Sequence, residues 1–350
     1  MSRKPRFALL IVILLTLFMA TGTQALSASK TIIRCAWGET LDPWSHPQSA
    51  FFNVFKSYCE TLSNGRIEVV LNPAASLGTA PQVLDLLVRN TVQVAGSMPT
   101  GVIASKYCPT LNALNIPYLI NDGNVAIDVM TTPKIINHVN DQLIKTAGIK
   151  FLSVEFEGLR YITNSVRPIK KPADLKGLKF RVMEGEVYST VMKQLGASPV
   201  PIAWAELYTG LQTKIADGQE NPAMNIVYKA LQEVQKYMTI PGPFGAVSGM
   251  FINNSFYNSL SKEDKWVVDT AAEYASQAHR GVFEVKNMEA LETLKKKLEV
   301  YVLSSAELEE FKKACQPAIL AMMDNLTKGD TQFVKDLMEQ IAVSEKKFGF

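Results

Sequence analysis

The sequence predicts an α/β protein that is divided into two lobes. Strand-like and helix-like patterns alternate over residues 31–96 and again over residues 178–222, as they do in sheets that carry helices on their faces. A helical pattern of about 35 residues begins at Ser261, and at about 1.5 Å per residue it would be about 50 Å long, too long for one lobe. We therefore expect mixed sheets flanked by helices, a hinge cleft between the lobes and one long helix that spans them.

The first 25 residues have the pattern of a secretory signal peptide. Three cations precede an apolar run over residues 7–20, and small residues lead to a cleavage site near Ala25. The alternative is an uncleaved anchor, but the run is shorter than the roughly 20 residues that span a bilayer. The leader holds three of the 36 basic residues and none of the 33 acidic ones, so the remaining chain is balanced at 33 and 33. The sequence therefore predicts export to the periplasm and gives no indication of a nucleic-acid partner.

The first half of the exported chain alternates between strands and helices. Residues 66–71 are rich in Val and Ile, as strands are, and Pro81 stands in the first turn of the next helical pattern. This β-α-β-α-β order predicts a mostly parallel sheet with helices on both faces. The expected strands cover residues 31–37, 66–71, 92–96 and 149–155, and the expected helices cover residues 49–63, 79–90 and 125–146.

The second half continues the same alternation. A short apolar strand contains one cation, Arg181, and the helix after it is expected to end at Gly196. Ser261 and Ser304 each begin an S/T-x-x-acid pattern, which is typical of a helix start. The expected strands cover residues 178–182, 199–201, 250–253 and 300–303, and the expected helices cover residues 187–195, 205–215, 223–237 and 261–298, one that starts at residue 304, and residues 331–347.

The stretch from Leu178 to Pro222 closely resembles the central signature of the solute-binding subunits of TRAP transporters, the DctP-type family. That family carries LKxR, then GAxPxPxxWxExYxALQ, then DGQENP, and the agreement extends over a stretch of about 45 residues at fixed spacing. Weaker similarity covers residues 63–69, 76–78 and 115–119, whereas a frequent Gly-x-x-Asp pair before the third strand is absent. The matching residues are Leu178, Lys179, Arg181, Gly196, Ala197, Pro199, Pro201, Trp204, Glu206, Tyr208, Leu211, Gln212 and Asp217 to Pro222.

The resemblance implies a periplasmic-binding-protein-like fold and an extracytoplasmic receptor. Residues 26–157 with about 247–286 would form lobe I, and residues 158–246 with about 287–350 would form lobe II, which binds the ligand carboxylate. The receptor would bind a small organic acid in the interlobe cleft, without a cofactor. It would deliver the acid to the small and large integral membrane subunits of a TRAP transporter, which use an ion gradient.

Four ligand-binding residues are implied by the same resemblance: Arg181, Arg160, Asn221 and Trp204. A guanidinium offers paired N–H donors that match the two oxygens of a carboxylate, and each charge-assisted bond contributes about 1.5–3 kcal/mol in a partly dry cleft. Taken alone, an arginine on an apolar strand is more often a sheet-edge side chain whose head reaches water. Likewise, Asn221 before Pro222 suits a helix N-cap, and Trp204 suits a core position.

Other polar residues are weaker candidates. Glu206 and Tyr208 lie within the motif, and His46 could reach the cleft from lobe I. The remaining histidines, His138 and His279, are expected at the surface, and the three histidines have no metal-ligand spacing. Pro243 and Phe244 stand where many family members have a histidine, which indicates a more apolar pocket or an altered ligand.

The four cysteines, Cys35, Cys59, Cys108 and Cys315, are widely spaced. We expect buried free thiols, with one or two disulfides as the alternative.

Two other functions remain as alternatives. An exported hydrolase would need a nucleophile and a base, but neither G-x-S-x-G nor H-E-x-x-H occurs. The acid pairs Glu155 with Glu157 and Glu184 with Glu186 each lie within one segment, which suits solvated or helix-cap acids better than glycoside chemistry. A receptor for a sensor system is not distinguished from a transport receptor by sequence. The acid also stays open, and Trp37, Trp44 and Trp204 only weakly favour a bulky or aromatic acid over a C4-dicarboxylate.

Overall fold

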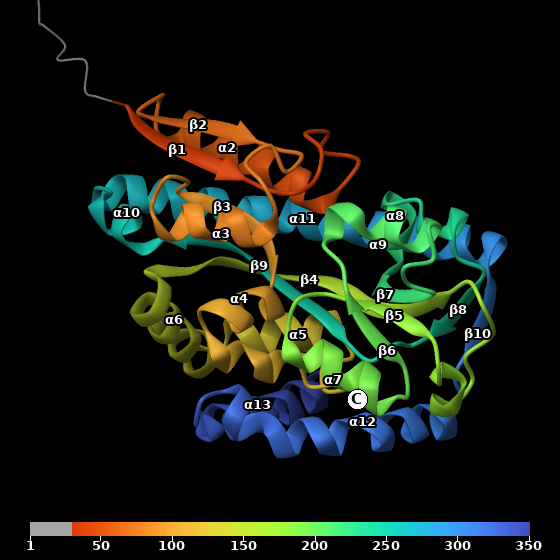
Figure 1. Cartoon of the computed structure of the whole chain (residues 1–350). Coiled ribbons are helices and arrows are strands. Elements are labelled where there is room, and N and C mark those ends of the chain that lie inside the picture. Colours follow the sequence, from red (N-terminus) through yellow and green to blue (C-terminus); the bar gives the residue numbers. More distant parts are fainter. Residues whose placement is uncertain (1–29) are drawn as a thin grey trace, which may run out of the picture.

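The computed structural model describes residues 30–350, so the predicted signal peptide lies outside the described residues. Figure 1 shows strands and helices that alternate along most of the chain. The strands are β1 (Thr31–Ala36), β2 (Ile67–Asn72), β3 (Val94–Pro99), β4 (Ile149–Asn164), β5 (Lys179–Val182), β6 (Ser198–Pro201), β7 (Gly218–Pro222), β8 (Tyr237–Ile240), β9 (Gly245–Asn253) and β10 (Glu299–Val302). The α-helices are α2 (Pro47–Leu62), α3 (Ala80–Val88), α4 (Thr100–Lys106), α5 (Gly123–Thr131), α6 (Pro133–Ala147), α7 (Glu186–Gln194), α8 (Leu207–Gln212), α9 (Ala223–Tyr228), α10 (Asn254–Ser259), α11 (Lys262–Lys297), α12 (Ser305–Leu326) and α13 (Thr331–Phe348).

Strand β4 joins the two lobes, because its two ends belong to different parts of the sheet. Residues 149–159 pair antiparallel with β9, which in turn pairs with β3, and β3, β1 and β2 run parallel. Residues 160–164 pair antiparallel with β7, which runs parallel to β5 and β6, and β8 lies on the other edge. We call the part around β1, β2, β3 and β9 the first lobe, and the part around β5, β6, β7, β8 and β10 the second lobe. The two-lobed mixed α/β fold is therefore confirmed.

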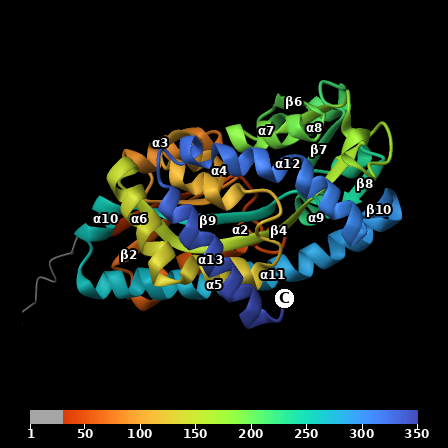
Figure 2. The ribbon, with the colours of Figure 1, turned by 90° about the horizontal axis from the view of Figure 1, so that it is seen from below.

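Helix α11 is the second connection between the lobes. It has 36 residues, and Ser261 caps it by accepting a hydrogen bond from the Asp264 N–H at 3.0 Å. Its first half buries Val267, Val268 and nearby alanines in the core of β1, β2 and α2, and its second half buries Phe283 and Leu294 in the core of the second lobe. Figure 2 shows the helix passing along both lobes. The predicted lobe-spanning helix is confirmed in length and in place.

Three predicted helices are shorter or broken. The pattern over residues 125–146 is two helices, because Thr132 is extended before Pro133, and a residue before proline is pushed out of the helical region. The helix expected over residues 205–215 is a 3-10 turn followed by α8. The helix expected over residues 223–237 ends at Tyr228, and Ala230 takes a left-handed conformation. A strong apolar period did not reveal these local breaks.

The C-terminal helices pack on different neighbours. Helix α12 contacts α7 of the second lobe, whereas α13 packs against α5 and α6. The predicted lobe boundaries remain a proposal, and this packing favours grouping residues 331–348 with the first lobe. Within residues 30–350 no helix combines the length and the apolar character needed to cross a membrane.

Two expectations about buried residues have different outcomes. All four cysteines are buried and carry free thiols, as expected. The expectation that His279 lies at the surface is wrong: it is 1% exposed, and its Nδ1 lies 3.1 Å from Glu155 Oε2. Because α11 crosses the sheet at β4, the strand that joins the lobes covers the face of the helix that carries His279.

Candidate functional site

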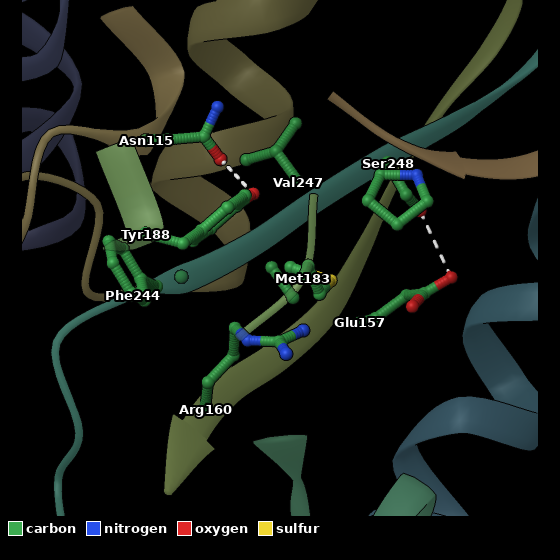
Figure 3. A pocket seen from close by; sticks show the side chains of 11 residues that line it. Asn115, Glu157, Arg160, Met183, Tyr188, Phe244, Val247 and Ser248 are labelled. Carbon is green, nitrogen blue, oxygen red and sulfur yellow. Dashed lines mark hydrogen bonds between the residues drawn. The ribbon is translucent and has the colours of Figure 1, made fainter. Parts of the chain in front are cut away.

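A pocket lies between the lobes, where β4 passes from one to the other. Figure 3 shows the side chains around it, with Asn115, Val247 and Ser248 from the first lobe facing Met183 and Tyr188 from the second. Its free volume is about 10 Å³, which is room for about one water molecule. The lobes must therefore open, or side chains must move, before an organic molecule can enter. The lining residues are Pro99, Asn115, Glu157, Arg160, Met183, Tyr188, Phe244, Gly245, Ala246, Val247 and Ser248.

Arg160 lies on β4 at the wall of this pocket, and its charge is already paired. Its Nε and Nη2 donate to the Glu220 carboxylate, with Nη2 3.1 Å from Oε1, and Nη2 also donates to the Glu220 carbonyl at 2.8 Å. The antiparallel register of β4 and β7 places the two residues on neighbouring strands. Burial disfavours the charged guanidinium, but Glu220 outweighs burial and raises the Arg160 pKa.

Arg181 lies on β5 and is buried, and no carboxylate within residues 30–350 forms an ion pair with it, although Glu220 and Glu184 attract its charge. It is 2% exposed, and its Nε donates to the Ile202 carbonyl at 2.9 Å. Its Nη1 is buried and has no hydrogen-bond partner among the described residues. Burial, and then the like charge of Arg160, lower the Arg181 pKa to about 10. The two predicted arginines are thus on separate strands of one sheet, as expected, but only one of them has a carboxylate partner.

Asn221 is held between its neighbours on β7 and Arg160. Its Oδ1 accepts from Arg160 Nη2 at 3.1 Å, and its Nδ2 donates to the Gln219 side chain. The helix-cap interpretation of Asn221 is wrong, because the cap of α9 is Pro222 and Asn221 is part of the strand. The asparagine amide therefore belongs to the polar group around the two arginines.

Trp204 is partly buried at the edge of the second lobe. Lys229 Nζ lies 5.0 Å from the centroid of the Trp204 ring. The Trp204 side chain is also hydrogen-bonded to Glu39 of the first lobe. Neither Trp204, Asn221 nor Arg181 lines the small pocket of Figure 3, whereas Arg160 does. The four predicted residues are gathered around the lobe interface, with Arg160 alone at the pocket surface.

Direct contacts hold the lobes together. The Tyr188 hydroxyl donates to Asn115 Oδ1 at 2.7 Å, and a Cβ at Gly101 would overlap the Tyr188 ring, so a glycine is needed there. The Thr40 N–H donates to the Tyr228 hydroxyl at 3.3 Å. His46 Nε2 lies 3.4 Å from Asn225 Oδ1, and burial lowers the His46 pKa to about 3. His46 therefore reaches the lobe interface as a neutral ring.

The aromatic residues of the sequence analysis have separate places. Phe244 lines the pocket and packs edge-on against Tyr188, with 5.0 Å between the ring centroids, which fits the expectation of a more apolar pocket. Trp37 is buried in the first core and stacks on Phe52, and Trp44 is 73% exposed, so neither is a wall of this pocket. Glu206 is exposed, and Tyr208 packs on the core of the second lobe.

Sequence reasoning did not place two acids near the cleft: Glu39 was not considered, and Glu157 was expected to be a solvated or helix-cap acid, whereas it is 7% exposed. Glu157 lines the pocket and accepts from the Ser248 hydroxyl at 3.1 Å. Glu39, which follows β1, is 6% exposed, and its Oε2 has no partner among the described residues. The only available signal for Glu39 was one acid close after an apolar strand. No group of three or more His, Cys, Asp and Glu residues within residues 30–350 could hold a metal ion.

The arrangement can bind an anion between the lobes. The buried guanidinium of Arg181 has an N–H without a partner among the described residues, and Arg160, whose charge acts on it, lines the interlobe pocket together with Asn115 and Tyr188. A carboxylate is the group that best matches an unused guanidinium N–H.

The family comparison agrees with this arrangement. The model of the family "Bacterial extracellular solute-binding protein, family 7" matches residues 38–326. The ectoine-binding periplasmic protein TeaA of Halomonas elongata is 28% identical over 271 residues, covering 76% of this chain and 78% of TeaA. A solute-binding protein of Roseobacter denitrificans is 31% identical over 269 residues, covering 76% of this chain and 80% of the relative.

Solved structures of related proteins share the fold. The sugar acid binding protein DctPAm of Advenella mimigardefordensis, in complex with galactonate, has a TM-score of 0.83 at 27% identity and covers 91% of this chain and 100% of its own. A TRAP periplasmic solute binding protein of Polaromonas sp. JS666, bound to D-erythronate, has a TM-score of 0.79 at 26% identity and covers 88% and 98%. This chain belongs to family 7 of the bacterial extracellular solute-binding proteins.

Proposed function

We propose that this protein is an extracytoplasmic receptor that binds a small organic acid between its lobes and holds the acid's carboxylate at Arg181. The observation that carries the proposal is the unpartnered Nη1 of a guanidinium that is only 2% exposed. A buried cation without a counter-ion is costly, and a ligand carboxylate would supply the missing charge.

The other three residues would complete the site around Arg181. Arg160 is neutralised by Glu220, so its main role would be to orient Asn221 and form the pocket wall. Asn221 would offer its Nδ2 to the ligand after giving up its bond to Gln219. Trp204 would form a side wall, with Lys229 over its ring.

Closure of the lobes would bury the acid. Tyr188 and Asn115 come from opposite lobes, and their hydrogen bond would form only in the closed state. The ligand would thereby shift an open–closed equilibrium, because its contacts with both lobes exist only after closure.

The proposal extends to transport. Relatives named for ectoine, galactonate and D-erythronate handle small carboxylates, and one of them is named a TRAP periplasmic solute binding protein. In this proposal the exported, periplasmic receptor delivers its acid to small and large integral membrane subunits that use an ion gradient. Its role is binding, and it carries out no reaction on the acid.

A thermal-shift screen tests the binding step. The chain from residue 26 is unfolded and refolded to remove carried-over ligand, and it is then melted with organic acids and with their amides. We expect one or more acids to raise the melting temperature while the matching amides do not, and Arg181→Met to abolish the shift.

The control for this screen is Arg167→Met. Arg167 is an arginine of the same lobe that donates to the Asp174 and Lys176 carbonyls, away from the pocket. This variant should keep the acid-induced shift. If sugars or amines raise the melting temperature and acids do not, the proposal is wrong.

A further inference from the structure

A second and larger cavity lies beside β4, the strand that joins the lobes, and we call it the hinge cavity. Gly158, Leu159 and Tyr161 of β4 line it, whereas the interlobe pocket is lined by Glu157 and Arg160 of the same strand. None of the described residues lines both spaces. The free volume of the hinge cavity is about 360 Å³, against about 10 Å³ for the interlobe pocket. Since sites for small organic ligands begin at roughly 300 Å³, this cavity has room for one while the lobes are together.

The walls of the hinge cavity come from three elements. They are the residues at the start of α5, the stretch of β4 where the pairing with β9 shifts register between Phe156 and Leu159, and α11 from His279 to Asn287. Phe156 pairs with β9 of the first lobe, whereas Phe283 of α11 belongs to the core of the second lobe. A molecule in this cavity would therefore touch both sides of the hinge.

Two buried acceptor atoms in this lining have no partner. His279 is 1% exposed, and its Nδ1 lies 3.1 Å from Glu155 Oε2. Glu155 also accepts from the Ser153 and Ser276 hydroxyl groups at 2.8 and 2.7 Å, so it is held in place as an acceptor for the imidazole. The Nδ1–H of a neutral ring then donates to Glu155, which leaves a lone pair on Nε2. This Nε2 and Asn287 Oδ1 are both buried without a partner among the described residues, and both call for a hydrogen-bond donor.

The charges around the hinge cavity favour a cation. Its lining carries three carboxylates and one guanidinium, those of Asp122, Glu155, Glu284 and Arg280. Arg280 is exposed, so water screens its charge. The rings of Phe156 and Phe283 also line the cavity, and aromatic faces attract cations. A donor that carries a positive charge fits this lining better than a neutral donor or an anion.

We propose that the hinge cavity is a second ligand site, which takes a small organic cation of the primary ammonium class. Its N–H groups donate to His279 Nε2 and Asn287 Oδ1, and its carbon chain lies against the aromatic rings. This site is separate from the acid site of the proposed function, since it uses neither Arg181 nor the interlobe pocket.

Protonation of His279 should oppose this cation. A protonated ring presents an N–H and a positive charge at Nε2 in place of a lone pair. Burial alone would lower the His279 pKa, but Glu155 and Glu157 raise it overall, so the ring takes up its proton close to neutral pH. The titratable and charged groups that face this ring or act on it are Glu155, Glu157 and Tyr161 of β4, Asp122 at the start of α5, Arg280 and Glu284 of α11, and His46 before α2.

Three probes separate charge from hydrogen bonding. Butylammonium has a positive charge and N–H donors, 1-butanol has a donor without a charge, and tetramethylammonium has a charge without a donor. Calorimetry with the refolded chain from residue 26, in phosphate buffer without any amine or organic acid, measures the dissociation constant of each. At pH 8 we expect butylammonium to bind at least tenfold more tightly than the other two. Its affinity should fall several-fold from pH 8 to pH 6, as His279 becomes protonated.

Substitutions on α11 locate the site. Asn287→Leu removes an acceptor and should weaken butylammonium by about tenfold. Glu284→Gln removes one exposed charge of the lining and should weaken it by about threefold. The matched control is Glu273→Gln, because Glu273 is an exposed glutamate of the same helix that does not line the cavity, and its affinity should not change. Circular dichroism melts check folding, and the exposed position of Glu284 keeps its variant informative if Asn287→Leu does not fold.

The outcomes decide whether the cavity holds a cation or only water. If butylammonium does not bind, or binds no more tightly than 1-butanol, the inference is overturned. It is also overturned if the affinity does not fall at pH 6, or if Glu273→Gln weakens binding as much as Glu284→Gln does. None of these results depends on whether an acid binds at Arg181.

Discussion

Replacing Arg181 and Arg160 by methionine should change the stability of the empty receptor in opposite ways. Lowering the Arg181 pKa from 12.5 to about 10 corresponds to about 3 kcal/mol, at about 1.36 kcal/mol per pKa unit. Because the pKa of this cation is depressed by folding, the penalty is present at pH 7 and disappears only as the pH rises through 10 toward 12.5. The charge at Arg181 therefore destabilises the folded state at neutral pH.

Arg181→Met removes this penalty and one useful contact. The lost bond from Nε to the Ile202 carbonyl is worth about 1.5–3 kcal/mol, because the donor is charged. The two changes nearly cancel, so the variant should be as stable as the parent or more stable by up to about 1.5 kcal/mol.

Arg160→Met leaves Glu220, which is 0% exposed, without its counter-ion. Breaking a buried pair in this way costs about 3–5 kcal/mol. The two arginines are close in the fold and similar in burial, so they are matched controls for each other. Their variants should differ by at least about 3 kcal/mol.

Urea unfolding at pH 7 of the refolded chain from residue 26 measures both variants. A loss of stability in Arg181→Met as large as that in Arg160→Met would contradict this expectation, because it would mean that Arg181 is already well paired.

Three further predictions concern the hinge and the core. Tyr188→Phe removes the 2.7 Å hydrogen bond to Asn115, which is worth about 1 kcal/mol, so acid binding should weaken about fivefold. The empty protein should also have a larger radius of gyration, measured by X-ray scattering. An unchanged affinity together with an unchanged radius of gyration would contradict a role of this bond in closure. Burial alone would lower the His279 pKa, but the Glu155 carboxylate raises it overall, so the pair stabilises the protein below about pH 6.5 and this stabilisation is lost as the pH rises through the folded pKa. The stability gap between the parent and His279→Gln should therefore shrink from pH 6 to pH 8, and a gap that grows would contradict the assignment. A thiol reagent should label no cysteine in the folded protein and all four after unfolding without reductant, since each is buried and free; fewer than four would indicate a disulfide.

Local signals predicted the parts of the fold that depend on local chemistry. The start of α11 could be predicted because Ser261 caps it directly, and the start of α12 because Ser304 and Glu307 form a capping box. The length of α11 could be predicted because no proline or capping glycine interrupts its helical pattern. The break between α5 and α6 was missed because helical apolar spacing continues past Thr132, although Pro133 was a visible signal.

The site was predicted less completely, because its energetics depend on contacts across the sheet. The family resemblance implied a ligand-binding role for both Arg160 and Arg181, but the register of β4 against β7 gives Glu220 to Arg160 alone. Glu39 is buried, and Trp204 and Lys229, which act on its side chain, are far away in the sequence, so nothing in its own segment reveals its surroundings.

A carboxylate of the bound ligand is expected to pair with the Arg181 guanidinium through its free Nη1. The most direct test is a crystal structure of the protein with an acid that raises its melting temperature. We expect a carboxylate oxygen about 2.7–2.9 Å from Arg181 Nη1, the usual length of a charge-assisted hydrogen bond. A bound acid whose carboxylate contacts Lys229 or solvent, with Nη1 still lacking a partner, would contradict it.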